Sequence, residues 1–454
     1  MPTGRLNPAI LERVQKCIQS KAPFSNGATP PRPAQRRILA GRELSSIPGR
    51  HLSGLGIWFS LLGLLLLILL PTTSTAADVQ TGLEVLIASD FSQLQGRRIG
   101  LITNQSGINH GWTSTIDLLS KAPGVKLVAL FSPEHGIRGV EDRPVPSTVD
   151  ERTGLPVYSL YSEKQKRPTD EMLQGIDTLV YDIQDVGTRF YTFSTTLAYT
   201  MEAAAQHHLK YVVLDRPDPI TGLRVEGPAL DTKHVSFVGY FPGMPIRHGM
   251  TVGELAQMFN EEKKIGADLV VIQMRGWRRW QWYDETGLPW VHPSPNMRNM
   301  NEALLYPAVA VLEGANVSVG RGTDTPFELF GAPWIDGIQL AKKVLAARVA
   351  GLRVYPIRFT PSAKPFANEH CGGIFLMVVE RDSFDTGKAM LALVSALQQL
   401  YPGKFQIEKI LPLLGSEALL QQLKDGAEMK SLHQSLSADE DRFKKIREKY
   451  LIYK

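Results

Sequence analysis

Cysteine is almost missing from this chain of 454 residues, which contains only Cys17 and Cys371. Two cysteines exclude a disulfide framework and a cysteine-rich zinc site. Cys371 lies next to an apolar run, and free cysteines are usually buried. We therefore expect Cys371 to behave as a small hydrophobic residue at the edge of a strand.

Several motifs of known chemistry are missing as well. No G-x-G-x-x-G follows the first predicted strand and no P-loop G-x-x-x-x-G-K-[ST] occurs, so neither dinucleotide binding nor P-loop phosphate binding is indicated. The chain also has no G-x-S-x-G nucleophile elbow and no H-E-x-x-H zinc motif. The remaining candidates for chemistry are Asp and Glu side chains that have histidine or arginine neighbours in the sequence. Such groups indicate either acid–base hydrolysis or a site for a hard metal ion.

Excess charge of one sign is confined to the first 77 residues. The chain has a net charge of +5, from 50 Lys and Arg against 45 Asp and Glu. Residues 1–77 contain nine of the basic residues and two of the acidic ones, so 78–454 is nearly neutral, with 41 basic and 43 acidic residues. No nucleic-acid partner is therefore expected, because such a partner requires a broad basic surface.

The one long apolar run, at 55–70, has sixteen residues and no charge. It is short for a membrane-spanning helix and matches the core of a signal peptide, with a basic stretch before it and small residues at Thr75 and Ala77 after it. We expect export to the periplasm or the cell exterior, with cleavage before Asp78. Two alternatives are a start downstream of Met1 and an uncleaved anchor, which would be the chain's only membrane contact.

From residue 78 onward, short runs rich in β-branched residues alternate with helical patterns, which predicts an α/β fold with a mostly parallel sheet covered by helices on both faces. Thr251 and Glu254 have the spacing of a capping box at the start of one helix. Ligands bind beyond the carboxyl ends of the strands in such sheets. The predicted strands are 98–104, 126–132, 178–182, 211–215 and 268–274, and the predicted helices are 114–119, 195–207 and 251–261.

A turn-rich joint after Pro289 marks a predicted domain boundary. We expect a basic N-region with a signal peptide or anchor at 1–77, a Rossmann-like catalytic domain at 78–290 and a smaller α+β domain at 291–454 that closes the cleft. In the last of these, the patterns predict a helix or strand at 304–312, helices at 338–350 and 388–400, strands at 354–359 and 374–379, and a charged helical tail at 416–450.

Polar residues follow four of the predicted strands, with TNQSG at 103–107, SPEHG at 132–136, DIQDVGTRFY at 182–191 and DRPDP at 215–219. Turn chemistry alone explains any single one of these loops. Four strand ends with ionisable or amide groups predict a polar cleft, because a parallel sheet places such ends side by side.

Glu134 is the leading catalytic candidate, because a rigid turn after a buried strand holds one carboxyl group at the cleft. A glycosidase needs a proton donor and usually a second carboxylate. Asp185 and Asp182 at the next strand end are candidate partners, as are Glu313 and Glu328 beyond the joint. Turn pairing between Asp185 and Arg189 is the structural alternative.

Three further features have two interpretations each. His135 could bind a divalent metal with Asp182 and Asp185, but no second histidine lies nearby, so it is better placed to orient Glu134 or contact substrate. Arg189 and Arg321 have glycine and threonine neighbours and suit a bidentate carboxylate contact, or else they pair with surface acids. Tyr191 is either a core aromatic or a stacking surface for a sugar.

The motifs resemble those of the exo-β-N-acetylmuramidase family, a NamZ-like family formerly described as a domain of unknown function. The likeness runs in unbroken order from about residue 81 to residue 453. It rests on IGLITN at 99–104, SPEHG at 132–136, DIQDVGTRFY at 182–191, LDRP at 214–217, VEGP at 225–228, HGMT at 248–251, PSPN at 293–296, EGAN at 313–316 and GRGT at 320–323.

This resemblance implies a Rossmann-like domain and a smaller C-terminal domain with the active site between them. It implies release of N-acetylmuramic acid from the non-reducing ends of peptidoglycan fragments, without a cofactor or metal, and it places the proposed catalytic glutamate on Glu134. We take Asp185 as the second catalytic candidate. The candidate substrate-binding residues are Asn104, His135, Asp182, Arg189, Tyr191, Arg216, Glu313, Asn316 and Arg321.

The expected activity is therefore that of an exported glycoside hydrolase acting on muramyl saccharides. Arg321 or Arg189 is expected to recognise the lactyl carboxylate that distinguishes muramic acid from glucosamine. The alternatives are a non-catalytic envelope protein that binds cell-wall sugars, which needs no acid of raised pKa, and a metal-dependent hydrolase, which a chelator would inhibit.

Overall fold

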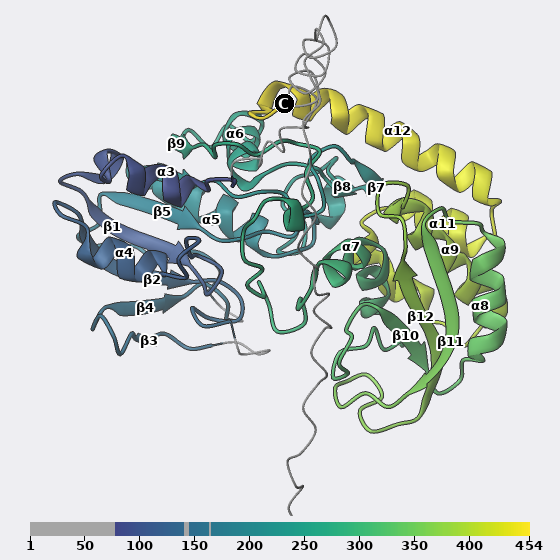
Figure 1. Cartoon of the computed structure of the whole chain (residues 1–454). Helices are drawn as coiled ribbons and strands as arrows, with labels where there is room; N and C mark the ends of the chain where they lie inside the picture. The colour runs from purple at the N-terminus through teal and green to yellow at the C-terminus, as the bar shows by residue number, and fades with distance from the viewer. Residues whose placement is uncertain (1–77, 140–144, 163–164) are drawn as a thin grey trace, which may run out of the picture. The chain divides into compact units, whose positions relative to one another are not determined.

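The computed structural model describes residues 78–139, 145–162 and 165–454 (Figure 1). Cys17 and the predicted export segment at 55–70 lie outside these ranges. In the described part of the chain, no helix is both long enough and apolar enough to cross a membrane.

The N-terminal lobe is built on a seven-stranded sheet in the order β3-β4-β2-β1-β5-β6-β9. All neighbouring strands are parallel except β3, which pairs antiparallel with β4 at one edge. The predicted α/β class with a mostly parallel sheet is confirmed. The strands are β1 (Arg98–Thr103), β2 (Lys126–Ser132), β3 (Thr148–Val149), β4 (Pro156–Ser159), β5 (Thr178–Asp182), β6 (Lys210–Leu214) and β9 (Asp268–Ile272).

Alternating side chains of each central strand enter two separate cores. In β1, Ile99 and Leu101 pack against α3 (Gly82–Ala88) and α4 (Thr115–Lys121), whereas Ile102 belongs to the core on the other face. That second face is covered by α5 (Phe193–Gln206) and α6 (Val252–Glu262). Both faces are therefore covered, as the continuous apolar strands predicted.

Helix α6 begins as its sequence predicts. The Thr251 hydroxyl accepts a hydrogen bond from the Glu254 N–H at 3.2 Å, and the Glu254 carboxylate accepts one from the Thr251 N–H at 3.0 Å. The predicted capping box is thus confirmed, and it fixes the point where the chain turns into α6.

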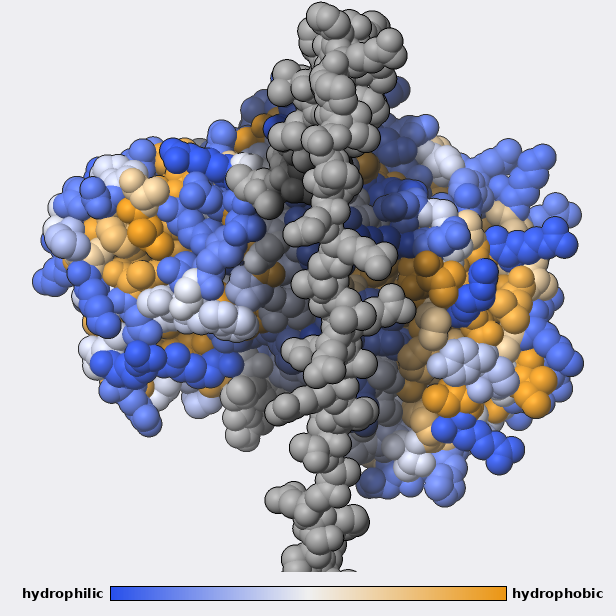
Figure 2. All heavy atoms as spheres, in the orientation of Figure 1, coloured by the Kyte–Doolittle hydropathy of each residue, from blue (hydrophilic) through white to orange (hydrophobic). Residues whose placement is uncertain are grey.

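The C-terminal lobe contains the antiparallel sheet β10-β12-β11, made of β10 (Leu329–Ala332), β12 (Cys371–Val378) and β11 (Leu352–Phe359). Figure 2 shows apolar surface over this lobe, where Tyr355 and Met377 are exposed. Cys371 is buried at the start of β12, as predicted. The helices are α7 (Met300–Val309), α8 (Gly337–Ala346), α9 (Thr386–Leu400), α10 (Leu411–Leu414) and α11 (Glu417–Lys424).

The last helix, α12 (Met429–Arg447), connects the two lobes. It packs against α9 and against β7 (Glu226–Ala229), which pairs antiparallel with β8 (Pro245–Arg247). Its last residue, Arg447, donates hydrogen bonds to the carbonyls of His248 at 3.1 Å and Gly249 at 2.5 Å. The end of the chain therefore supports the loop that follows β8.

Candidate active site

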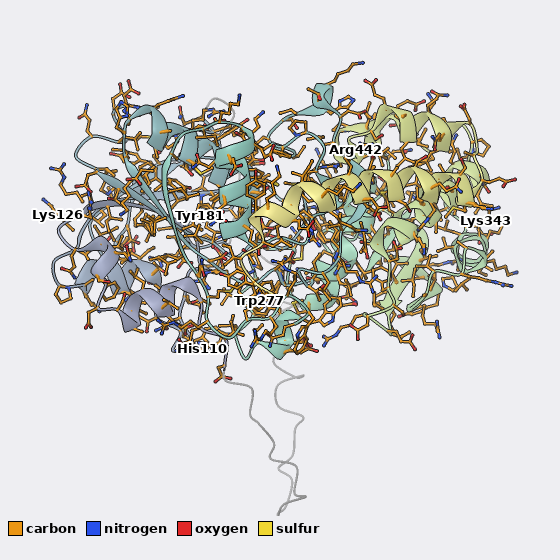
Figure 3. All side chains as sticks on the ribbon, turned by 90° about the horizontal axis from the view of Figure 1, so that it is seen from above. His110, Lys126, Tyr181, Trp277, Lys343 and Arg442 are labelled. Atoms are coloured by element: carbon orange, nitrogen blue, oxygen red, sulfur yellow. The ribbon has the colours of Figure 1, made fainter. Side chains whose placement is uncertain are left out.

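The carboxyl ends of the parallel strands meet at the inner edge of the sheet. Figure 3 shows Lys126, the first residue of β2, at the outside of the N-terminal lobe and Tyr181, near the end of β5, toward the C-terminal lobe. The Thr103 hydroxyl donates to the Asp182 carbonyl at 2.8 Å, and the Gln184 amide donates to the Pro217 carbonyl at 2.8 Å. The prediction that these strand ends lie side by side is confirmed.

Glu134 lies in a tight turn directly after β2. His135 and Gly136 both have left-handed backbone, with φ of 72° and 76°, and the Gly136 N–H donates to the Pro133 carbonyl at 3.2 Å. The Thr192 hydroxyl, at the start of α5, donates to Glu134 Oε2 at 2.5 Å. A turn of unusual backbone and a neighbouring helix thus fix a half-buried carboxylate at the sheet edge.

A row of aromatic rings leads from this carboxylate to the C-terminal lobe. The Tyr191 ring packs edge-on against Phe193 with centroids 4.8 Å apart and against Tyr306 of α7 at 5.8 Å, and Tyr306 packs against Phe327 at 4.7 Å. Burial raises the pKa of the Tyr306 hydroxyl, and the nearby charges include Glu313 and Arg321 as well as Glu134. Carboxylates from both lobes therefore lie around one tyrosine.

Asp185, Asp218 and His248 form a buried polar group beside this row. Asp185 Oδ1 accepts a hydrogen bond from the Gly187 N–H at 2.8 Å and lies 4.0 Å from His248 Nε2. Burial, and then the charges of Arg447 and Arg247, lower the pKa of His248 to about 3. The ring is therefore neutral, and its Nδ1 accepts a hydrogen bond from the Met250 N–H at 3.2 Å, which leaves the proton on Nε2, facing Asp185.

Burial also raises the pKa of Asp185 and of Asp218 to about 7, and it does the same for Asp215 beneath α6. Within the described residues, Oδ2 of Asp185 and Oδ2 of Asp218 have no hydrogen-bond partner. Buried polar atoms are normally paired, so these two oxygens are available to a water or to a ligand. Asp185 therefore combines an open oxygen with a pKa near neutrality, as an acid–base group requires.

These raised pKa values predict a pH-dependent stability. The folded protein keeps protons on these carboxyl groups up to about pH 7, whereas the unfolded chain releases them near pH 4, so the free energy of unfolding falls as the pH rises between these values. We expect Asp218→Asn to raise the free energy of unfolding at pH 8 by roughly 1–3 kcal/mol and to give little or no gain at pH 4. Urea unfolding at both pH values measures this difference.

The matched control is Asp441→Asn on α12, where the carboxyl group is exposed to solvent, and its effect should be small at both pH values. Equal changes at pH 4 and pH 8 for Asp218→Asn would contradict the assignment of a raised pKa to this carboxyl group.

Two of the predicted substrate-binding residues, Asp182 and Arg216, bind each other in the interior. Arg216 Nε and Nη2 donate to the two carboxylate oxygens of Asp182 at 2.5 and 3.0 Å, and both side chains are buried. The Thr115 hydroxyl also donates to Asp182. This bidentate pair joins the ends of β5 and β6, so its evident role is to hold the sheet edge on which the site lies.

Asn104 has a similar position after β1. Its Oδ1 accepts hydrogen bonds from the Ser106 N–H at 2.9 Å and the Ser106 hydroxyl at 2.5 Å, whereas its Nδ2 is buried without a partner among the described residues. Asn104 thus shapes the loop and keeps one donor available.

Arg189 is fully buried, and its guanidinium donates to four backbone carbonyls. Nη1 reaches Pro228 O at 2.9 Å and Met244 O at 3.0 Å, and Nη2 reaches Leu413 O at 2.6 Å and Leu414 O at 2.9 Å. Burial lowers its pKa to about 9. The geometry therefore shows a cross-link between the loop after β5, β7 and α10, and none of these four hydrogen bonds turns the arginine toward Glu134.

Arg321 and Glu313 form an ion pair in the C-terminal lobe through Arg321 Nε. The Arg321 guanidinium also lies 5.3 Å from the Phe327 ring centroid, at the far end of the aromatic row. Asn316 belongs to the same lobe, but its amide binds Lys404 O at 2.9 Å and the Gln406 N–H at 2.9 Å. Glu313 and Arg321 thus border the aromatic row, and Asn316 fixes the 404–406 turn.

No group of three or more His, Cys, Asp or Glu side chains suited to a metal ion occurs within 78–139, 145–162 and 165–454. His135, Asp182 and Asp185 therefore do not form the metal site considered from the sequence. Asp182 is engaged by Arg216, and Asp185 faces His248.

Some residues of this site were not singled out from the sequence. Thr192 follows directly after Tyr191, so the end of that motif could have suggested it. Tyr306 lies in an apolar helix and gives no such signal. His248 stands in the HGMT motif that contributed to the family resemblance, although no role was assigned to it.

The fold and the site define a two-lobed α/β protein, with carboxyl groups beyond the strands of a mostly parallel sheet and a second lobe facing them. Two family models match, "Exo-beta-N-acetylmuramidase NamZ, N-terminal" over residues 99–301 and "Exo-beta-N-acetylmuramidase NamZ, C-terminal" over residues 304–453. The chain belongs to this exo-β-N-acetylmuramidase family of glycosidases.

The similar proteins agree with this assignment. The peptidoglycan β-N-acetylmuramidase NamZ of Bacillus subtilis (strain 168) is 43% identical over 386 residues, which are 84% of this chain and 93% of that protein. Two crystal structures of DUF1343 family proteins from Bacteroides fragilis NCTC 9343 match with TM-scores of 0.77 and 0.69 at 36% and 34% identity. Each covers 83% of this chain and 99% of its own.

Proposed function

We propose that this protein removes N-acetylmuramic acid from the non-reducing ends of peptidoglycan fragments, with Glu134 as the general acid. The observation that carries the proposal is the placement of the Glu134 carboxylate, which the Thr192 hydroxyl and the turn after β2 hold beside Tyr191 at the sheet edge. The similar protein of Bacillus subtilis is named for this activity.

In this mechanism, Glu134 donates its proton to the glycosidic oxygen as the bond to the leaving sugar breaks. Water completes the hydrolysis by bonding to the anomeric carbon, and a carboxylate takes up its proton. Asp185 is the proposed second carboxyl group, because its Oδ2 is open and its pKa of about 7 suits an acid–base role. Tyr191 and Tyr306 supply aromatic surface between the two lobes, on which a sugar ring can pack.

Release of N-acetylmuramic acid from a MurNAc–GlcNAc disaccharide by the purified protein tests this function. We expect turnover that persists with a chelator, since the catalytic groups are carboxyl groups. Turnover lost on chelation would support a metal-dependent hydrolase instead. Binding of the disaccharide without turnover would support a non-catalytic cell-wall protein.

We also propose that the protein is exported and acts on glycan outside the cytoplasm. The uncharged run at 55–70 and the small residues before Asp78 support this location. A mature protein that begins at Asp78 in the extracytoplasmic fraction is the expected result of N-terminal sequencing. Full-length protein in the cytoplasm would contradict it.

A further inference from the structure

Lys166 lies close to Glu134, between two aromatic rings. Its ammonium is 3.6 Å from the ring centroid of Tyr161 and 4.4 Å from that of Phe237, and the two centroids are 5.7 Å apart. An ammonium over two ring faces is held by cation–π attraction in a narrow range of positions. The rings therefore fix a positive charge that a lysine side chain would otherwise leave mobile.

Lys166 is near enough to Glu134 for the two charges to interact. Partial burial lowers the pKa of Lys166, and the nearby charge of Glu134 opposes that shift. Among the described residues, no carboxylate forms an ion pair with Lys166. The neighbouring cation of the same aromatic cluster, Arg167, lies 3.6 Å from the Tyr199 ring centroid and is already paired with Glu202.

The other cations around the site have protein partners. Arg189 binds four backbone carbonyls, Arg216 binds Asp182 through two hydrogen bonds, and Arg321 binds Glu313. A substrate anion that binds any of these must compete with those partners. A substrate anion that binds Lys166 displaces no protein carboxylate of the described residues from it. A ligand carboxylate would supply the counter-charge that this partly buried ammonium lacks.

We propose that Lys166 is a specificity residue that binds the lactyl carboxylate of the muramyl sugar while Glu134 acts on the glycosidic bond. This inference rests on the proposed function. The lactyl ether is attached to C3 of the sugar, two bonds from the anomeric carbon, so a cation beside the general acid is within reach of it. Glucosamine lacks this carboxylate and leaves the Lys166 ammonium without a partner, which gives discrimination between the two sugars.

The test compares MurNAc–GlcNAc with the same disaccharide bearing a neutral lactyl amide in place of the carboxylate. We expect wild-type kcat/KM to be about 30-fold lower on the amide, the usual size of one charge-assisted hydrogen bond. Lys166→Met keeps an unbranched apolar side chain between the rings and removes the charge. It should lose about 30-fold on the acid and little on the amide, so that the acid-to-amide ratio approaches one.

Lys166→Arg should keep most of the preference for the acid, and Arg167→Met, which removes a paired cation from the same cluster, should leave the ratio unchanged. Equal losses of Lys166→Met on both substrates would overturn the proposal, because a structural role does not depend on the lactyl charge. Collapse of the ratio in Arg321→Met with an unchanged ratio in Lys166→Met would assign the carboxylate to Arg321.

Failure of the proposed function gives a different result. If wild type hydrolyses neither disaccharide, calorimetry with free N-acetylmuramic acid and its amide decides the role of Lys166 independently. If wild type binds N-acetylmuramic acid more tightly than its amide and Lys166→Met does not, the result would support Lys166 as the carboxylate-binding residue. No preference in wild type, or preference kept in the variant, would overturn it.

Discussion

Glu134→Gln is expected to lower kcat for release of N-acetylmuramic acid by at least about 10³-fold, within the range for loss of a general acid. Glutamine has nearly the same shape, and its amide oxygen can still accept the hydrogen bond that the Thr192 hydroxyl donates to Oε2. It has no proton to give to the glycosidic oxygen. Because Glu134 is only half-buried, the thermal midpoint should stay within a few degrees of wild type.

Thr192→Val provides the matched comparison. This substitution removes the hydroxyl that positions Glu134 and keeps the proton donor, so we expect a loss of roughly 10- to 100-fold in kcat with little change in KM. Steady-state kinetics on MurNAc–GlcNAc, together with thermal unfolding of each variant, separates chemistry from folding. A folded Glu134→Gln variant with near wild-type kcat would assign the general acid to another group, with Asp185 the next candidate.

Much of the fold follows from local sequence pattern. The apolar strands 126–132 and 178–182 have the bounds of β2 and β5, and Thr251 with Glu254 caps α6. The predicted strand at 268–274 ends earlier, at Ile272. The predicted helix or strand at 304–312 covers the second half of α7, which runs from Met300 to Val309, and part of the 3-10 helix Ala310–Gly314 that follows. The local sequence determines whether a segment forms a helix or a strand, whereas the residue at which it ends also depends on contacts with neighbouring segments.

The short strands were not predicted. β3 has two residues, β8 has three, and β7 reads EGPA, a sequence with glycine and proline that has low intrinsic strand preference. Pairing with the neighbouring strand and packing against α12 determine β7, and such contacts cannot be read from a local pattern.

The same limit applies to the candidate site. Parallel pairing places the strand ends together, so the location of Glu134 and Asp185 could be inferred from the sequence. The partners of the charged residues could not. Arg216 and Asp182 are 34 positions apart and bind each other, and Arg189 reaches α10, more than 220 positions away. A charged residue in a motif beside the cleft can therefore stabilise the fold instead of binding substrate, and only its contacts distinguish these two roles.

Arg189→Met is expected to lower the free energy of unfolding by on the order of 3 kcal/mol. The substitution removes hydrogen bonds to the carbonyls of Pro228, Met244, Leu413 and Leu414, and the last two lie at the end of α10. The Met244 carbonyl still accepts a hydrogen bond from the Leu230 N–H at 3.0 Å, so the loss of its bond to Arg189 costs less than the loss of the other three. Among the described residues, the buried Arg189 guanidinium has no ion-pair partner, so burying its charge costs free energy that the methionine variant avoids. The net loss in the free energy of unfolding is therefore smaller than the sum for four hydrogen bonds.

Urea unfolding measures this loss. The control is Arg353→Met on β11, which removes an exposed arginine and should change the free energy of unfolding by less than about 0.5 kcal/mol.

The kinetic result distinguishes the structural role from the sequence-based hypothesis that Arg189 recognises the lactyl carboxylate. If the side chain is a cross-link between β7 and α10, the folded variant keeps the wild-type ratio of kcat/KM on MurNAc–GlcNAc to that on the lactyl amide. If Arg189 binds substrate instead, stability is unchanged and that ratio collapses. Since every assigned hydrogen bond of this guanidinium ends on a main-chain carbonyl, the first outcome is the one that the structure predicts.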